Sequence, residues 1–95
     1  MSDDNLPPEF WARADQVIAL ANKQAEDSTI GKVSSSLLYA AARYNAFNVA
    51  SSTQNVEDLK RDKEEAIRYF TEQYRKMLQE NLDDHIENFA NYKLT

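Results

Sequence analysis

The sequence contains no cysteine, one glycine and two prolines among its 95 residues. Without cysteine the chain has no disulfide bonds, no thiolate metal ligands and no cysteine nucleophile. Glycine and proline make most sharp turns and sheet corners, so their scarcity disfavours a β fold. A single glycine also excludes the glycine-rich loops that hold phosphate groups.

Acidic residues outnumber basic ones. The chain has 11 Lys and Arg against 16 Asp and Glu, which gives a net charge of −5. This balance repels the phosphate backbone of nucleic acids unless the basic residues are segregated on one face. The residues that would have to form such a face are Arg61, Arg68, Arg75 and Lys76. Glutamates are interleaved with them, at positions 57, 64, 65 and 72. We therefore expect no nucleic-acid partner.

The sequence also lacks a long hydrophobic run. Its most apolar stretch, residues 33–50, contains Arg43, Asn45 and Asn48, and is too short and too polar to span a bilayer comfortably. The first ten residues carry acidic side chains and have no apolar segment of the secretory type. We therefore expect a cytoplasmic protein without a membrane partner.

Hydrophobic residues are nevertheless sufficient for one core, since they make up 42% of the chain and include one Trp, five Tyr and four Phe. Their three- and four-residue spacing predicts an all-α fold. Three main helices are expected, over Pro8 to about Ala25, over about Ile30 to Ser51, and from about Asn55 onward. We expect residues 1–7 to be a disordered tail and residues 8–95 to form a single helical domain.

Local signals mark where each helix begins. Pro8 suits a first helical turn, where its missing N–H costs nothing. The second helix has three possible N-caps, Asp27, Ser28 and Thr29, and for the third helix Asn55 forms a capping pair with Asp58.

The second helix is expected to be the central element of a small antiparallel bundle. Between Lys32 and Glu57 its only formal charge is Arg43, and a helix with so little charged surface is surrounded on most sides. Short loops on either side favour antiparallel neighbours.

The third helix has charged rows of alternating sign on one side, including Lys60, Glu64, Arg68 and Glu72 at four-residue steps. Beyond Met77 its apolar set becomes Leu78, Leu82, Ile86 and Phe89. The mean direction of this set is rotated by more than about 60° from the earlier apolar stripe, at 100° per residue. Either the helix wraps its neighbours or it breaks. We favour a break at residues 81–84, with Asp83 capping a short fourth helix that reaches about Tyr92.

No constellation of catalytic or metal-binding residues is apparent. His85 has Asn81, Leu82, Asn88 and Phe89 at helical spacing, and none of them is a metal-binding partner of the usual kind. Adjacent carboxylates point about 100° apart on a helix and do not converge on one substrate. We expect no catalytic, cofactor-binding or metal-binding residue and no enzymatic activity. The alternative is a small-ligand-binding or metal-dependent enzyme that uses the interhelical groove near Arg43.

Five residues are predicted to bind partners. Arg43, Tyr44 and Asn48 could line a groove facing another protein, because Tyr and Arg are favoured at interface hot spots. The competing interpretation pairs Arg43 with an acid of the first or third helix. Leu82 and Phe89 belong to the rotated apolar stripe, which predicts a homodimer because symmetric dimers dominate among soluble oligomers. The alternative is that the segment carrying that stripe folds back as a fourth helix and buries the stripe against the second helix of the same chain.

Three blocks of the sequence resemble a family of small proteobacterial proteins known only as a domain of unknown function. They are residues 8–15, residues 36–47, which read SLLYAAARYNAF, and residues 69–84. The resemblance covers the chain from Pro8 to about Tyr92. It implies a small helical bacterial protein and transfers no site, since such a family carries no assigned activity.

Overall fold

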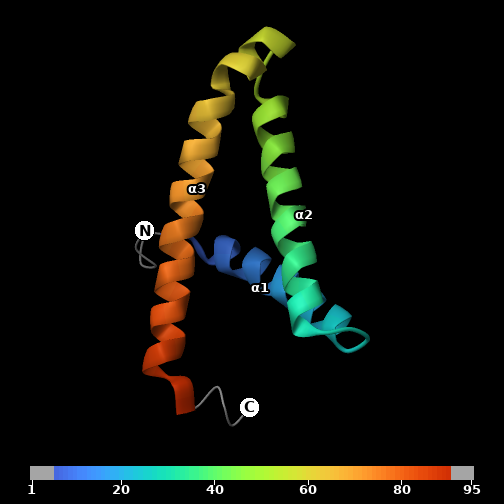
Figure 1. Cartoon of the computed structure of the whole chain (residues 1–95), viewed down its shortest axis with the longest axis vertical. Coiled ribbons are helices and arrows are strands. Elements are labelled where there is room, and N and C mark those ends of the chain that lie inside the picture. Colours follow the sequence, from blue (N-terminus) through green and yellow to red (C-terminus); the bar gives the residue numbers. More distant parts are fainter. Residues whose placement is uncertain (1–5, 91–95) are drawn as a thin grey trace. The chain divides into compact units, whose positions relative to one another are not determined.

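The computed structural model describes residues 6–90 of the chain. Within this range the chain forms three helices, α1 (Pro8–Ala25), α2 (Ile30–Ser51) and α3 (Val56–Glu87), and no β-strand (Figure 1). The predicted all-α class and the bounds of the first two helices are confirmed. Most of the expected N-terminal tail, residues 1–5, lies outside the described residues.

Each helix begins where the local signals predict. The backbone of Pro7 is extended and Pro8 takes the first helical position of α1. Of the three candidates before α2, Thr29 is the N-cap: its side-chain Oγ1 accepts a hydrogen bond from the backbone N–H of Lys32 at 3.2 Å. Asn55 caps α3, since its Oδ1 accepts from the backbone N–H of Asp58 at 2.9 Å. These contacts satisfy N–H groups that have no partner inside the helix.

The chain divides into two compact units, one ending at Ser52 and the other beginning at Thr53. The first unit contains α1 and α2, which contact each other and meet at their connecting loop (Figure 1). Its best-buried side chain is Val33, which is 8% exposed and lies in the first turns of α2. Ala21 and Ala25, in the last turns of α1, are half-buried. The core of this unit is therefore at its loop end.

The expected antiparallel bundle with α2 at its centre is not confirmed. Val33 is the only buried side chain of α2, and among residues 6–90 it is the only buried hydrophobic residue. Leu37 and Phe47, which the bundle would bury, are 38% and 63% exposed. Low formal charge made α2 a suitable central helix, but α1 covers it mainly near the loop, so most of its apolar surface stays accessible within their shared unit.

The second unit contains α3, which runs without interruption from Val56 to Glu87. The expected break at residues 81–84 is therefore wrong, and Asp83 lies inside the helix. Asn81 is accommodated there because its Nδ2 donates to the backbone carbonyl of Met77 at 2.7 Å. The Nδ1 of His85 donates in turn to the carbonyl of Asn81 at 2.8 Å. With no proline or glycine in this segment, nothing in its covalent structure interrupts the helix.

The interruption of the helix comes at Asn88, which is the C-cap of α3. Its backbone N–H donates to the carbonyl of Asp84 at 3.0 Å, and its Nδ2 also reaches the Asp84 carboxylate at 3.0 Å. Helical geometry resumes at Phe89 and Ala90, where the described residues end. The predicted fourth helix is not confirmed, and Tyr92 lies outside the described residues.

Candidate interaction surfaces

The five predicted partner-binding residues fall on the two different units. Arg43, Tyr44 and Asn48 belong to α2, whereas Leu82 belongs to α3 and Phe89 follows its C-cap. All five are exposed. They therefore define two separate surfaces, one on each unit.

The α2 surface is formed by side chains from successive turns of one helix. Arg43 and Phe47, and likewise Tyr44 and Asn48, are four residues apart, so the two pairs form neighbouring rows on one side of α2. The rings of Tyr44 and Phe47 are 6.0 Å apart and tilted by 44°, and these side chains are 71% and 63% exposed. This side of α2 presents two aromatic rings next to a cation and an amide.

The partner of Arg43 was predicted to be an acid of the first or third helix. Within the α1–α2 unit, the described acids form no ion pair with Arg43, so pairing with an acid of α1 is not observed. A pairing with an acid of α3 stays a prediction. The Arg43 guanidinium is exposed. An exposed guanidinium can bind a carboxylate in a bidentate pair, with two parallel N–H···O hydrogen bonds.

The distal α3 surface is an open, shallow groove on one helix. Its floor is the row Leu78, Leu82 and Ile86, which are 43%, 53% and 73% exposed. Arg75, Gln79 and Asp83 line its polar edge. Residues 75, 79 and 83 follow each other at four-residue steps, so they form a polar row along one side of the helix.

A different face of α3 contains its half-buried side chains. Apart from Asp58 in the first turn, they recur at three- and four-residue steps, at Leu59, Asp62, Ala66, Phe70, Gln73 and Met77. Consecutive helical residues point about 100° apart, so Met77 and Leu78 lie on different faces. The rotation of the apolar set that the sequence predicts beyond Met77 is thus a change of face on one continuous helix.

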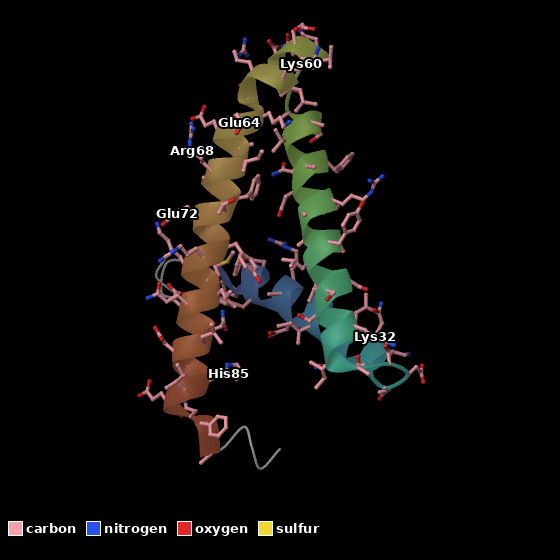
Figure 2. All side chains as sticks on the ribbon, viewed as in Figure 1. Lys32, Lys60, Glu64, Arg68, Glu72 and His85 are labelled. Carbon is pink, nitrogen blue, oxygen red and sulfur yellow. The ribbon has the colours of Figure 1, made fainter. Side chains whose placement is uncertain are left out.

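Charged side chains occupy much of the remaining surface of α3. Figure 2 shows Glu64, Arg68 and Glu72 projecting along one side of the helix, with His85 on another. Lys60 and Arg61 pair with acids three residues earlier, Glu57 at 3.6 Å and Asp58 at 3.1 Å, and Arg61 also lies 3.6 Å from Asp62. Because acids neutralise these cations locally, the N-terminal part of α3 does not present an unscreened basic patch.

Between residues 6 and 90, no three histidine or acidic side chains come together as a possible metal site. None of the helices within that range has the length and apolar character needed to cross a membrane.

Comparison with known proteins places the chain in a family. It is similar to the protein NB7890A from Shewanella sp., whose structure was solved by NMR, with 39% sequence identity and a TM-score of 0.76. The similarity covers 96% of this chain and 97% of that protein. No curated protein matches the chain. Residues 10–86 match the model of a family described as "Protein of unknown function (DUF3144)". The resemblance that the three sequence blocks suggested is therefore confirmed, and the chain belongs to this family of proteins of unknown function.

Proposed function

We propose that this chain is a small cytoplasmic protein-interaction or scaffolding module without catalytic activity, and that it forms a homodimer. The observation that supports a contact function is the amount of apolar surface left accessible. Eighteen large hydrophobic side chains are exposed among residues 6–90, whereas Val33 alone is buried. Scattered exposed apolar residues are normal on a protein surface, but a continuous row of them marks a contact site.

The distal groove of α3 is the surface that we assign to the homodimer. Leu78, Leu82 and Ile86 form such a row, and Phe89 extends it at 58% exposed. A second copy is the simplest cover, because most soluble oligomers are symmetric and twofold dimers dominate. The competing cover is the α1–α2 unit of the same chain. The mass of the protein in solution distinguishes these two alternatives.

The α2 surface is what we assign to a different protein. Aromatic rings and arginine provide large contact areas with few rotatable bonds, which is why they dominate interface hot spots. Tyr44, Phe47 and Arg43 supply both kinds of group on one side of α2. The favoured partner presents an apolar patch next to a carboxylate.

Light scattering on a sizing column tests the homodimer. We expect the mass of two chains at micromolar concentration. The mass of one chain at that concentration would rule out the homodimer, and the α1–α2 unit would then be the cover for the groove.

Elemental analysis of the purified protein tests the absence of catalytic metal chemistry. We expect no stoichiometric metal. One metal ion per chain would instead favour the metal-dependent enzyme that the groove near Arg43 could accommodate. Salt-dependent retention on DNA would similarly contradict a role in protein contacts alone.

An affinity pull-down from the native cytoplasm tests the α2 surface. Tyr44→Ala should remove a specific partner that the unmodified protein retains. Tyr69→Ala is the matched control, because Tyr69 is 59% exposed and lies on α3, outside the α2 surface. Equal loss with both variants would contradict the assignment of this surface.

A further inference from the structure

Because α3 is continuous through residues 81–84, one inclined row of apolar residues runs from its half-buried face, at Phe70, onto the distal groove. The row contains seven apolar residues: Ile67, Phe70, Tyr74, Leu78, Leu82, Ile86 and Phe89. Their spacing, 3, 4, 4, 4, 4 and 3, reads the same in both directions, and Leu78 is the midpoint. Six of the seven are at least 43% exposed, and Phe70 is half-buried. A row with this symmetry is complementary to a reversed copy of itself.

Reversal about Leu78 brings unlike halves of the row together. Leu78 meets its equivalent in the second copy, and Tyr74 meets Leu82 of the second copy. Phe70 likewise meets Ile86 of the second copy. The aromatic half of one helix thus packs on the aliphatic half of the other, twice by symmetry. The groove floored by Leu78, Leu82 and Ile86 provides the depression that the ring of Tyr74 from the second copy would fill.

The polar edge of the groove favours the reversed arrangement over a parallel one. In a parallel twofold pair the polar edges of the two copies lie on opposite sides of the contact and do not meet. Reversal about Leu78 instead places both polar edges on the same side of the contact, running in opposite directions, so that Arg75 of one copy lies on the same side as Asp83 of the second copy. Opposite charges brought together in this way favour association.

We propose that two copies of α3 cross in antiparallel orientation, with the twofold axis beside Leu78 and with Tyr74 and Leu82 as the flanking contacts. This inference rests on the proposed homodimer and specifies its geometry. The central row follows four-residue steps, and helices that interdigitate such rows cross at about −50°. The contact is therefore densest at Leu78 and weakens toward Ile67 and Phe89.

Single-cysteine cross-linking of the full-length protein tests this geometry directly, because the chain has no native cysteine. Helix axes about 8 to 10 Å apart, with Cα atoms at a radius of about 2.3 Å, place the two Cα atoms of residue 78 up to about 5.5 Å apart. That separation suits a disulfide bond. Leu78→Cys should therefore form a covalent dimer under mild oxidation.

The flanking positions distinguish the antiparallel pair from a parallel one. Two copies of residue 74 lie eight residues apart along the reversed helices, about 12 Å, which exceeds the reach of a disulfide. Tyr74→Cys alone and Leu82→Cys alone should therefore give little covalent dimer. An equimolar mixture of the two variants should give the mixed dimer. Lys76→Cys is the matched control, since it points about 160° away from Leu78 and should not cross-link.

The cross-linking results test the antiparallel contact between the α3 helices, whereas the mass in solution tests the homodimer. Efficient cross-linking of Tyr74→Cys alone and of Leu82→Cys alone would overturn the antiparallel orientation in favour of a parallel pair. Failure of all of these variants to cross-link, with two chains by light scattering, would overturn the α3 contact while the homodimer stands. The mass of one chain for the unmodified protein would overturn both.

Discussion

The loop end of the α1–α2 unit and the distal half of α3 are both built from aliphatic residues at helical spacing, yet they differ in burial. Val33 is 8% exposed, whereas Leu82 and Ile86 are 53% and 73% exposed. The loop end is covered because four residues, 26–29, bring α1 back against the start of α2. Within residues 53–90 no second helix is joined to the distal row by such a short loop. Helical spacing therefore specifies an apolar face, but proximity along the chain decides which face is covered locally.

The largest effect is expected from charges placed on the distal row, which is Leu78, Leu82, Ile86 and Phe89. Leu82→Asp combined with Phe89→Asp should dissociate the homodimer, because each unpaired charge buried at an interface costs several kcal/mol. We expect the dissociation constant to rise by at least about 100-fold, as measured by light scattering over a concentration series.

The matched control for that double substitution is Leu20→Asp combined with Leu38→Asp. These residues are 57% and 54% exposed on α1 and α2, so the control adds the same charge at similarly exposed positions. It should leave the dimer intact, with unchanged helix content in the far-ultraviolet spectrum. Equal dissociation of both variants would show that the distal row is not a special surface.

At the loop end, truncation of the buried side chain should have the largest effect on stability. Val33→Ala should lower the free energy of unfolding by about 1 to 2 kcal/mol, because it removes two buried methyl groups. Thermal unfolding should show a midpoint lower by several degrees.

Val17→Ala is the control for Val33→Ala, because Val17 is 49% exposed and the change in helix propensity is the same. It should change the free energy of unfolding by less than about 0.5 kcal/mol. Similar losses at the two positions would mean that Val33 is not the centre of the local core.

Loss of a helix cap should have a smaller effect. Thr29→Ala removes the oxygen that accepts the Lys32 N–H and should cost about 1 kcal/mol in the free energy of unfolding. Ser28→Ala, one residue earlier, should cost little, since the cap of α2 is Thr29. Urea unfolding of the two variants measures the difference, and a larger loss for Ser28→Ala would contradict the observed capping.

The smallest expected effect concerns asparagine in two positions of α3. Asn55→Ala removes an N-cap and should destabilise the protein, by about 1 kcal/mol. Asn81→Ala lies inside the continuous helix and should stabilise it, by up to about 0.7 kcal/mol, because alanine has the higher helix propensity. Thermal unfolding should therefore shift in opposite directions for the same substitution. Destabilisation by Asn81→Ala would indicate that its bond to the Met77 carbonyl matters more than propensity.

Much of the secondary structure could be predicted from the sequence because its determinants are local. Pro8 at the first turn, Thr29 among the candidate caps and Asn55 with Asp58 mark three helix starts within a residue or two. The break predicted at residues 81–84 failed for a physical reason. Asn81 and Asp83 are poor helix formers on average, but an exposed helix tolerates them when a side-chain hydrogen bond is available and no proline intervenes.

The candidate surfaces were only partly predictable. The rotated apolar set of Leu78, Leu82, Ile86 and Phe89 was predicted from the sequence, and the structure shows that Leu78, Leu82 and Ile86 line one groove with Phe89 beyond it. Arg43 and Tyr44 were expected on a sparsely charged, enclosed helix, and the structure shows them exposed. Exposure of a side chain depends on what packs against its helix, which the residues of that helix do not encode.

The sequence by itself determined that the chain is helical, where its helices begin, and that it belongs to a family of proteins of unknown function. Spacing, capping and propensity act over three or four residues, so they can be read directly along the chain. Only the tertiary structure decided that burial is concentrated at Val33 and that α3 continues through residues 81–84. Burial depends on contacts between residues distant in sequence, and helix continuity depends on the sum of many small free energies, so neither follows from any single local pattern.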